Sequence, residues 1–217
     1  NRLTSDSLHG AFISGLLATG CSVTDIGYAS SPMVYFAACK LDIDAGANIT
    51  ASHNPKQYNG VKLVAKNAHS ICGDEIQELY RIIAEKEFSP RAKSSHEVLE
   101  ISPPYRDFFK ERCAFKKPWK IVIDAGNGIC GKYLPELFRS LGGEVIELYC
   151  DQDGRFPNHE PDPIVEKNTS ELSKKVLSSG ADLGLSFDGD GDRFTVVDQL
   201  GQFHDANQTF GLLINDL

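Results

Sequence analysis

Three aspartates, Asp188, Asp190 and Asp192, alternate with two glycines directly after an apolar segment. Glycine permits positive φ values, which would fold this loop so that alternate side chains converge. Carboxylate oxygens at this density suit Mg²⁺, which usually combines a few protein carboxylates with phosphate oxygens of a substrate. Three like charges repel one another unless a cation or strong donors offset them, so the pattern favours a metal site over a solvated acidic turn.

Two other metal or phosphate loops fit this segment less well. An EF-hand loop that starts at Asp188 requires Gly at its sixth position and Glu at its twelfth, where this chain has Arg193 and Gln199. A phosphatase of the haloacid dehalogenase type, with the pattern DxDx(T/V), requires Thr or Val where Asp192 stands. That interpretation also leaves a second unusual loop, around Ser52, unexplained.

The second loop has the sequence TASHNP at residues 50–55 and is followed by YNGVK at 58–62. A serine in a turn bounded by Asn and Pro can present its hydroxyl to a ligand, and His53 and Lys62 could move protons or stabilise phosphate charge. Taken alone, the loop fits a structural turn with a capping serine better. Together with the acidic loop it predicts a phosphoserine, whose charge of about −1.5 to −2 a Mg²⁺ ion could neutralise and Arg193 could clamp.

The segments TASHNP, YNGVK and DGDGDR, in this order, resemble the α-D-phosphohexomutase superfamily. DQDGRFPNHEPDP at residues 151–163 resembles its phosphomannomutase/phosphoglucomutase branch, and the similarity covers essentially the whole chain. The resemblance implies a serine phosphorylated in the resting enzyme. It implies a catalytic set of Ser52, Lys62 (general acid/base) and His53, phosphate or substrate contacts from Arg193 and Asn54, and Mg²⁺ ligands Ser52, Asp188, Asp190 and Asp192.

The implied reaction interconverts hexose 1-phosphate and hexose 6-phosphate, of mannose or glucose, through a 1,6-bisphosphate. The implied cofactors are Mg²⁺ and glucose or mannose 1,6-bisphosphate as activator, and the full-length protein is expected to be a monomer. The family has four domains, with a sugar-recognition loop in the third and a phosphate site in the fourth. Neither follows in this chain, and an active-site arginine of the family's first strand is expected before Asn1. We therefore expect a fragment with low or no mutase activity alone.

Alternating helix and strand patterns predict an α/β fold, in two consecutive domains with mixed, mostly parallel sheets flanked by helices. Pro and Ser interrupt any period over residues 88–104, so we place the domains at 1–97 and 98–217. Helices are expected over residues 8–20, 32–41, 74–87, 131–141, 169–178 and from 205 onward. Strands are expected over residues 21–26, 45–51, 61–64, 120–124, 144–149, 182–187, 194–198 and around 203.

Bulk properties narrow the partners. The 217 residues carry a net charge of −8, which argues against a nucleic-acid backbone as partner, and no apolar run reaches the ~20 residues that span a bilayer. The six cysteines are scattered, which favours buried, reduced thiols and a cytoplasmic protein. The remaining histidines, His9, His69, His96, His159 and His204, show no ligand spacing, so we expect surface or capping roles.

Two rival functions stay open at this point. Residues 126–131 match GxGxxG after a predicted strand, which is the pattern of a dinucleotide-binding dehydrogenase. The same glycines could instead serve a tight turn and close packing of helix against strand. The other rival is a non-enzymatic binding module, which sustained turnover by the chain would exclude.

Overall fold

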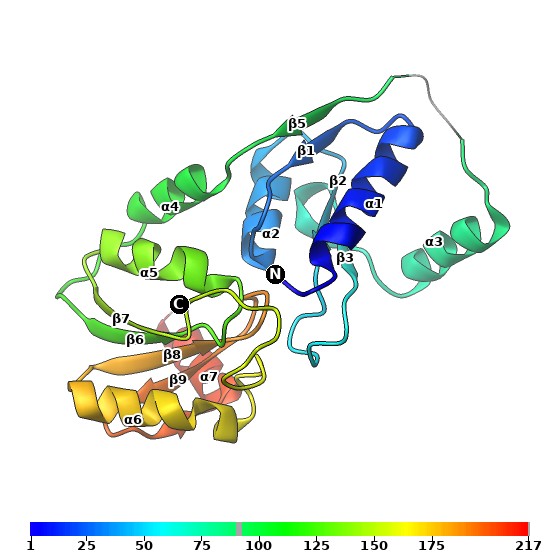
Figure 1. Cartoon of the computed structure of the whole chain (residues 1–217). Coiled ribbons are helices and arrows are strands. Elements are labelled where there is room, and N and C mark those ends of the chain that lie inside the picture. Colours follow the sequence, from blue (N-terminus) through cyan, green and yellow to red (C-terminus); the bar gives the residue numbers. More distant parts are fainter. Residues whose placement is uncertain (90–92, 217) are drawn as a thin grey trace. The chain divides into compact units, whose positions relative to one another are not determined.

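The computed structural model describes residues 1–89 and 93–216 and divides into two compact units (Figure 1). Unit 1 consists of Asn1–Leu3, Ala51–Asn59 and Ser102–Leu217, and unit 2 of Thr4–Thr50 and Gly60–Ile101. The loop around Ser52 therefore belongs to the same unit as the acidic loop. The division into domains at 97/98 stays a prediction, because the compact units are not continuous in sequence.

Unit 1 is built on a five-stranded mixed sheet with the order β10-β9-β8-β6-β7. The central strand β6 pairs in parallel with β7 and β8, and β9 and β10 continue the sheet in antiparallel fashion. The strands are β6 (Lys120–Asp124), β7 (Glu144–Leu148), β8 (Leu183–Phe187), β9 (Phe194–Asp198) and β10 (Phe203–His204).

Helices cover both faces of this sheet (Figure 1). Because side chains alternate along β6, Ile121 and Ile123 face a core cluster that includes the start of α5, while Val122 faces Leu172 and Val176 of α6. The helices of unit 1 are α4 (Ser102–Lys110), α5 (Cys130–Ser140), α6 (Ser170–Ser179), which follows the 3₁₀ turn Glu166–Thr169, and α7 (Ala206–Asp216).

Unit 2 contains an antiparallel sheet, β2-β3-β4, and a parallel pair, β1-β5. Its core includes Met33, Ala37 and Ala38 from α2 and Val64 from β3. Its elements are α1 (Ser5–Ala18), β1 (Val23–Asp25), α2 (Ser31–Lys40), β2 (Ala45–Ile49), β3 (Val61–Ala65), a 3₁₀ turn (Lys66–Ala68), β4 (His69–Ser70), α3 (Asp74–Glu85) and β5 (His96–Val98).

The predicted α/β class with mixed sheets flanked by helices is confirmed. The expectation of mostly parallel pairing is wrong, because among the described residues β9 pairs antiparallel with β8 and β10, and β3 pairs antiparallel with β2 and β4. Each predicted helix and strand is present within a few residues of its expected bounds. Two elements are not among those predicted from the sequence. Helix α4 contains Pro103 and Pro104, which interrupt a helical pattern although proline is well tolerated in a first helical turn. Strand β5 pairs with β1, which lies more than 70 residues away in sequence.

The prediction of buried cysteines is wrong for four of the six. Cys21, Cys39, Cys72 and Cys113 are exposed, Cys130 is buried and Cys150 is half-buried, and all are free thiols. A cysteine in an apolar segment can still lie on the solvent side of its element, as Cys39 does on α2. Within residues 1–89 and 93–216, no helix is both long and apolar enough to cross a bilayer.

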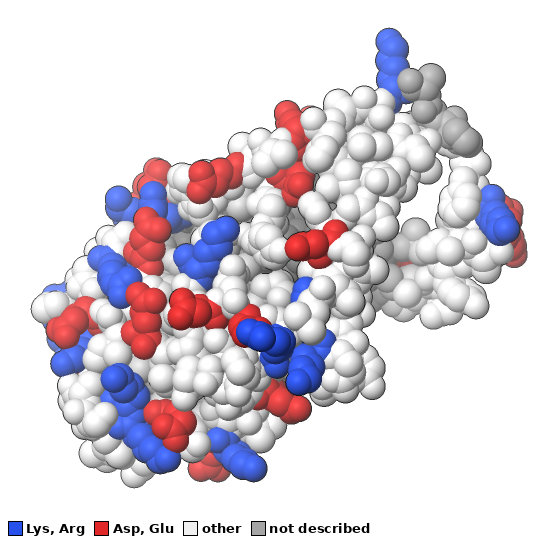
Figure 2. Space-filling view, viewed as in Figure 1, with Lys and Arg blue, Asp and Glu red and all other residues white. Residues whose placement is uncertain are grey.

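Charged side chains of both signs are interspersed over the visible surface of unit 1 (Figure 2). Several form ion pairs between exposed groups, such as Arg139 with Glu147 (2.6 Å) and Lys174 with Glu171 (2.7 Å). Exposed pairs of this kind contribute roughly 0–1 kcal/mol each, so they matter more for solubility than for stability.

Candidate active site

The acidic loop leaves the end of β8 and turns back into β9. The backbone N–H of Asp188 donates to the carbonyl of Arg193 (3.1 Å), and the N–H of Gly191 donates to the Asp188 carboxylate (3.0 Å). Gly191 has φ +76°, a conformation that side chains other than glycine rarely adopt. The turn brings one oxygen each of Asp188, Asp190 and Asp192 within 4.8 Å of one another.

Two of these three carboxylates are shielded from solvent. Asp188 and Asp190 are buried, and Asp192 lies toward the surface. Burial and the charge of Asp190 raise the pKa of Asp188 to about 6, although the hydrogen bond from Ser52 opposes the shift. A set of converging carboxylate oxygens that resists ionisation without a counterion fits a hard divalent cation such as Mg²⁺.

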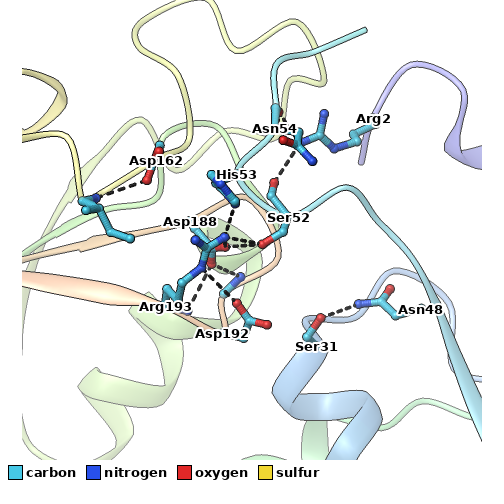
Figure 3. A network of polar contacts seen from close by, with 12 residues as sticks. Arg2, Ser31, Asn48, Ser52, His53, Asn54, Asp162, Asp188, Asp192 and Arg193 are labelled. Atoms are coloured by element: carbon cyan, nitrogen blue, oxygen red, sulfur yellow. Dashed lines mark hydrogen bonds and ion pairs between the residues drawn. The ribbon is translucent and has the colours of Figure 1, made fainter. Parts of the chain in front are cut away.

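The serine loop, Ala51–Asn59, brings Ser52 against this acidic loop (Figure 3). The Ser52 hydroxyl donates a hydrogen bond to Oδ2 of Asp188 (2.8 Å) and accepts one from Nη2 of Arg193 (2.5 Å). The same Arg193 nitrogen donates to the Asp188 carboxylate at 2.9 Å. The hydroxyl of Ser52 thus meets a buried carboxylate and a guanidinium that lie 136 and 141 positions away in sequence.

The other predicted residues have different places. Nδ1 of His53 accepts a hydrogen bond from Arg193, so His53 joins the cluster. Asn54 takes part through its backbone, since its N–H donates to the Ala51 carbonyl (3.0 Å); a side-chain contact with substrate stays a prediction. Lys62 lies in unit 2, on β3 opposite Asn48, and its role in proton transfer also stays a prediction.

The glycines of the GxGxxG segment are packing residues. A Cβ at Gly128 would lie 3.0 Å from the Gly189 carbonyl oxygen, and one at Gly131 would lie 2.0 Å from the carbonyl oxygen of Cys150. The N–H of Ile129 donates to the Gly189 carbonyl (3.2 Å), so this turn supports the acidic loop. The structure therefore favours the packing interpretation of these glycines over a dinucleotide site.

The sequence alone did not predict the roles of two supporting residues, His159 and Arg2. His159 is not a surface residue: its Nε2 lies 3.0 Å from the fully buried carboxylate of Asp124, and its Nδ1 lies 2.8 Å from the Glu160 carbonyl oxygen. Arg2, only 6% exposed, holds the serine loop through its backbone carbonyls (Figure 3). His159 lies within the segment 151–163 that resembles the family, and this position could have indicated a role near the site. No sequence pattern indicated a role for Arg2.

Comparisons with known proteins agree with these observations. A family model described as phosphoglucomutase/phosphomannomutase, alpha/beta/alpha domain I, matches residues 1–90. A second, described as alpha/beta/alpha domain II of the same family, matches residues 103–201. The two matches together account for most of the chain.

Individual relatives point the same way. The chain is 42% identical over 200 residues to a phosphomannomutase/phosphoglucomutase of Pseudomonas aeruginosa, which covers 92% of this chain and 43% of that relative. It is 37% identical over 217 residues to a phosphoglucomutase of Neisseria meningitidis, or 100% of this chain and 47% of the relative. A solved structure of a phosphoglucomutase/phosphomannomutase family protein from Burkholderia thailandensis superimposes with a TM-score of 0.88 at 38% identity, covering 93% of this chain and 45% of the other. The chain thus spans less than half the length of these relatives.

Proposed function

The chain belongs to the phosphomannomutase/phosphoglucomutase branch of the α-D-phosphohexomutase superfamily, and from this premise we propose that Ser52 carries the phosphoryl group in a hexose-phosphate mutase reaction. The reaction interconverts hexose 1-phosphate and hexose 6-phosphate, of mannose or glucose. The chain spans the family's domains I and II, so the activity is proposed for the whole protein.

One observation carries this proposal. The Ser52 hydroxyl lies 2.8 Å from a carboxylate oxygen of buried Asp188 and 2.5 Å from the guanidinium of Arg193. A structural serine in a turn has no need of a buried carboxylate and a guanidinium on the same oxygen. A serine that takes up and releases a phosphoryl group needs both a cation site and a clamp for phosphate oxygens beside it.

The acidic loop would hold the metal. We assign Asp188, Asp190 and Asp192, with one oxygen of phosphorylated Ser52, as ligands of Mg²⁺, which when bound offsets negative charge on the phosphoryl group. Arg193 contributes a permanent cation whose planar fork can hold two phosphate oxygens at once. His53, which accepts a hydrogen bond from Arg193, helps to orient that guanidinium.

The chemical step is a displacement at phosphorus. The bond between phosphorus and the Ser52 oxygen breaks as a bond forms to a hydroxyl oxygen of the hexose monophosphate, and the product is a hexose 1,6-bisphosphate. The sugar hydroxyl gives its proton to Lys62 as the general base, and the Ser52 oxygen, next to Arg193, keeps the electron pair of the broken bond. When that oxygen takes back the other phosphate, Lys62 returns the proton to the sugar oxygen that leaves. Glucose or mannose 1,6-bisphosphate can therefore phosphorylate Ser52 in an unphosphorylated enzyme.

The six cysteines are free thiols, which fits a cytoplasmic site of action.

Intact-mass measurement tests the proposal. The chain is incubated with glucose 1,6-bisphosphate and Mg²⁺, and the phosphorylated residue is mapped by fragmentation. We expect one added phosphate on Ser52 and none in a Ser52→Ala variant. An unmodified wild-type chain, or a phosphate that persists in Ser52→Ala, would contradict the assignment.

A further inference from the structure

The guanidinium of Arg2 is buried beneath the serine loop and bonded to its backbone. It donates hydrogen bonds to four carbonyl oxygens of the loop, those of Ser52 (2.7 Å), Asn54 (2.6 Å), Pro55 (2.8 Å) and Tyr58 (2.9 Å). Both terminal nitrogens take part, each with two acceptors. The loop forms the connection between β2 and β3, so its carbonyls have no sheet partners to align them.

We propose that Arg2 is a positioning residue that sets the conformation of the serine loop and thereby aims the Ser52 hydroxyl at Asp188. The role of Arg2 in phosphoryl transfer rests on the proposed function, whereas its hold on the loop conformation does not. No contact of Arg2 with the hydroxyl oxygen is required, because the effect is exerted through the backbone.

The backbone at Ser52 needs such support. Ser52 has φ +51°, in the left-handed region that residues other than glycine, asparagine and aspartate seldom occupy. A conformation of this kind persists only where surrounding contacts impose it. The Ser52 carbonyl is held between Arg2 and the acidic loop, since a Cβ at Gly189 would lie 2.6 Å from that oxygen.

Arg2 is itself fixed from the opposite side. Its guanidinium lies 5.3 Å from the centre of the Phe156 ring, and the side chain of the preceding residue, Asn1, donates to the Asn127 carbonyl at 2.7 Å. The backbone of Asn1 runs so close to Gly154 that a Cβ there would lie 2.3 Å from the Asn1 carbonyl oxygen. The arginine therefore connects the segment around residues 154–156 to the serine loop.

The guanidinium cannot be replaced by a simple charge. Burial lowers the pKa of Arg2 while the charges of Asp190 and Asp188 oppose that effect, and arginine stays protonated at any pH a protein tolerates. Lysine keeps the charge but offers three donors from a single nitrogen, so it cannot reach acceptors spread along the loop. Arg2→Lys consequently separates the geometry of the fork from its charge.

The test compares Arg2→Lys and Arg2→Ala with the wild type, and Arg155→Ala serves as a matched control. Arg155 lies in the segment around residues 154–156 that contacts Asn1 and Arg2, but its own side chain is exposed and its guanidinium pairs with Asp153. The first readout is amide hydrogen exchange in peptides covering residues 51–59, where the N–H groups of Asn54 and Tyr58 are hydrogen-bonded. Peptides covering β6 and β8 report on the rest of unit 1. The second readout is the rate at which Ser52 gains phosphate from glucose 1,6-bisphosphate with Mg²⁺.

In both Arg2 variants we expect exchange in 51–59 to accelerate by about tenfold or more while β6 and β8 keep wild-type protection. The phosphorylation rate is expected to fall by roughly 10²-fold, the usual effect of displacing a reacting group by about 1 Å. Guanidinium chloride, at concentrations far below those that unfold proteins, should partly restore the phosphorylation rate of Arg2→Ala but not that of Arg2→Lys. Arg155→Ala should match the wild type.

Other outcomes overturn the inference. Unchanged exchange in 51–59 would show that Arg2 does not hold the loop. Equal loss of protection in β6 and β8 in both variants would make Arg2 a general packing residue. A wild-type chain that gains no phosphate would contradict the proposed function alone, because the exchange comparison would still decide the role of Arg2 in the loop.

Discussion

At the scale of single residues, the carboxyl group of Asp188 links the stability of unit 1 to pH. Burial and the charge of Asp190 raise its pKa from 3.8 to about 6, so the folded state binds this proton more tightly than the unfolded state does. The resulting stabilisation is complete below about pH 4 and is lost as the pH rises through about 6, at a cost on the order of 2–3 kcal/mol. Above pH 6 the ionised carboxylate has Arg193 as a partner at 2.9 Å, and a bound Mg²⁺ would offset the remaining negative charge of the acidic loop.

Mg²⁺ should therefore stabilise the chain more at high pH than at low pH. We expect a larger increase in Tm on adding Mg²⁺ near pH 7.5 than near pH 5, because ligand binding to the folded state adds RT ln(1 + [L]/Kd), where Kd is smaller when Asp188 is ionised. Thermal unfolding at matched ionic strength, with NaCl in place of MgCl₂, measures the difference.

Asp190→Asn changes one of the proposed Mg²⁺ ligands and removes the main charge that acts on Asp188. This variant should show a smaller Tm increase with Mg²⁺ and a weaker loss of stability between about pH 4 and 6. Glu171→Gln, on the surface of α6, should behave as wild type. Equal Mg²⁺ effects at both pH values in the wild type would count against the acidic loop as the metal site.

His159 links stability to pH in a separate range. Burial alone would lower its pKa, but the hydrogen bond and charge of Asp124, with the bond to the Glu160 carbonyl, raise it overall. Tyr149, also titratable, faces the ring in an edge-on contact with ring centres 5.6 Å apart. Because both ring nitrogens lie beside oxygen acceptors, the imidazolium, with two N–H donors, is the form that satisfies them.

A raised histidine pKa contributes stability that is fully present below the unfolded value of about 6.5 and is lost as the pH rises through the folded value. His159→Gln should therefore cost about 2–3 kcal/mol near pH 6, since it leaves the buried Asp124 charge without its partner, and less near pH 9. Urea unfolding at both pH values measures the difference. His204→Gln, whose pair with Asp198 is more exposed, is the control. A cost that does not change with pH would mean that His159 is neutral.

At the scale of elements, the glycines of the GxGxxG segment before α5 allow the helix to pack closely on the chain. Gly131 lies where α5 crosses the chain at Cys150, and a Cβ there would overlap the Cys150 carbonyl oxygen. Gly131→Ala should therefore displace α5 from β7 and lower the free energy of unfolding by about 2–3 kcal/mol.

Gly211 in α7 provides the matched control, because nothing lies within 4 Å of a Cβ built there. Gly211→Ala should be neutral or stabilise by up to about 1 kcal/mol, as expected for a helix interior. Denaturant unfolding compares the two variants. If Gly131→Ala lowered the free energy of unfolding no more than Gly211→Ala does, α5 would not pack closely on the segment after β7.

Most elements could be predicted from the sequence because their signals are local. The apolar run of β6 and the glycines of the acidic loop carry their own patterns. The elements and residues that were missed depend on distant partners. All three residues of β5 are exposed, and the strand is defined by its pairing with β1. Arg2 acquires its role from backbone carbonyls 50 or more positions away. Backbone acceptors leave no trace in side-chain identity, so no pattern could have singled out Arg2.

At the scale of the whole molecule, the serine loop connects two strands of unit 2 but belongs to unit 1 by its contacts. The loop leaves β2 and returns to β3 where the N–H of Thr50 donates to the Gly60 carbonyl at 2.9 Å. Between those residues, Ala51–Asn59 is part of the unit that contains the acidic loop. The cluster of Ser52, Asp188 and Arg193 is therefore assembled from chain segments of one compact unit, even though a sequence-based division separates them.

This organisation predicts which amides lose protection together. Leu172→Ala, in the core of unit 1, and Met33→Ala, in the core of unit 2, each remove a fully buried side chain at a cost of about 2–5 kcal/mol. Because amides exchange with the cooperative unit that holds them, Leu172→Ala should accelerate exchange in β6, β8 and residues 51–59 together. Met33→Ala should instead accelerate exchange in β2 and β3 and leave 51–59 close to wild type. If residues 51–59 followed β2 and β3 in both variants, the loop would be an extension of its own hairpin, and Ser52 would depend on unit 2 for its position.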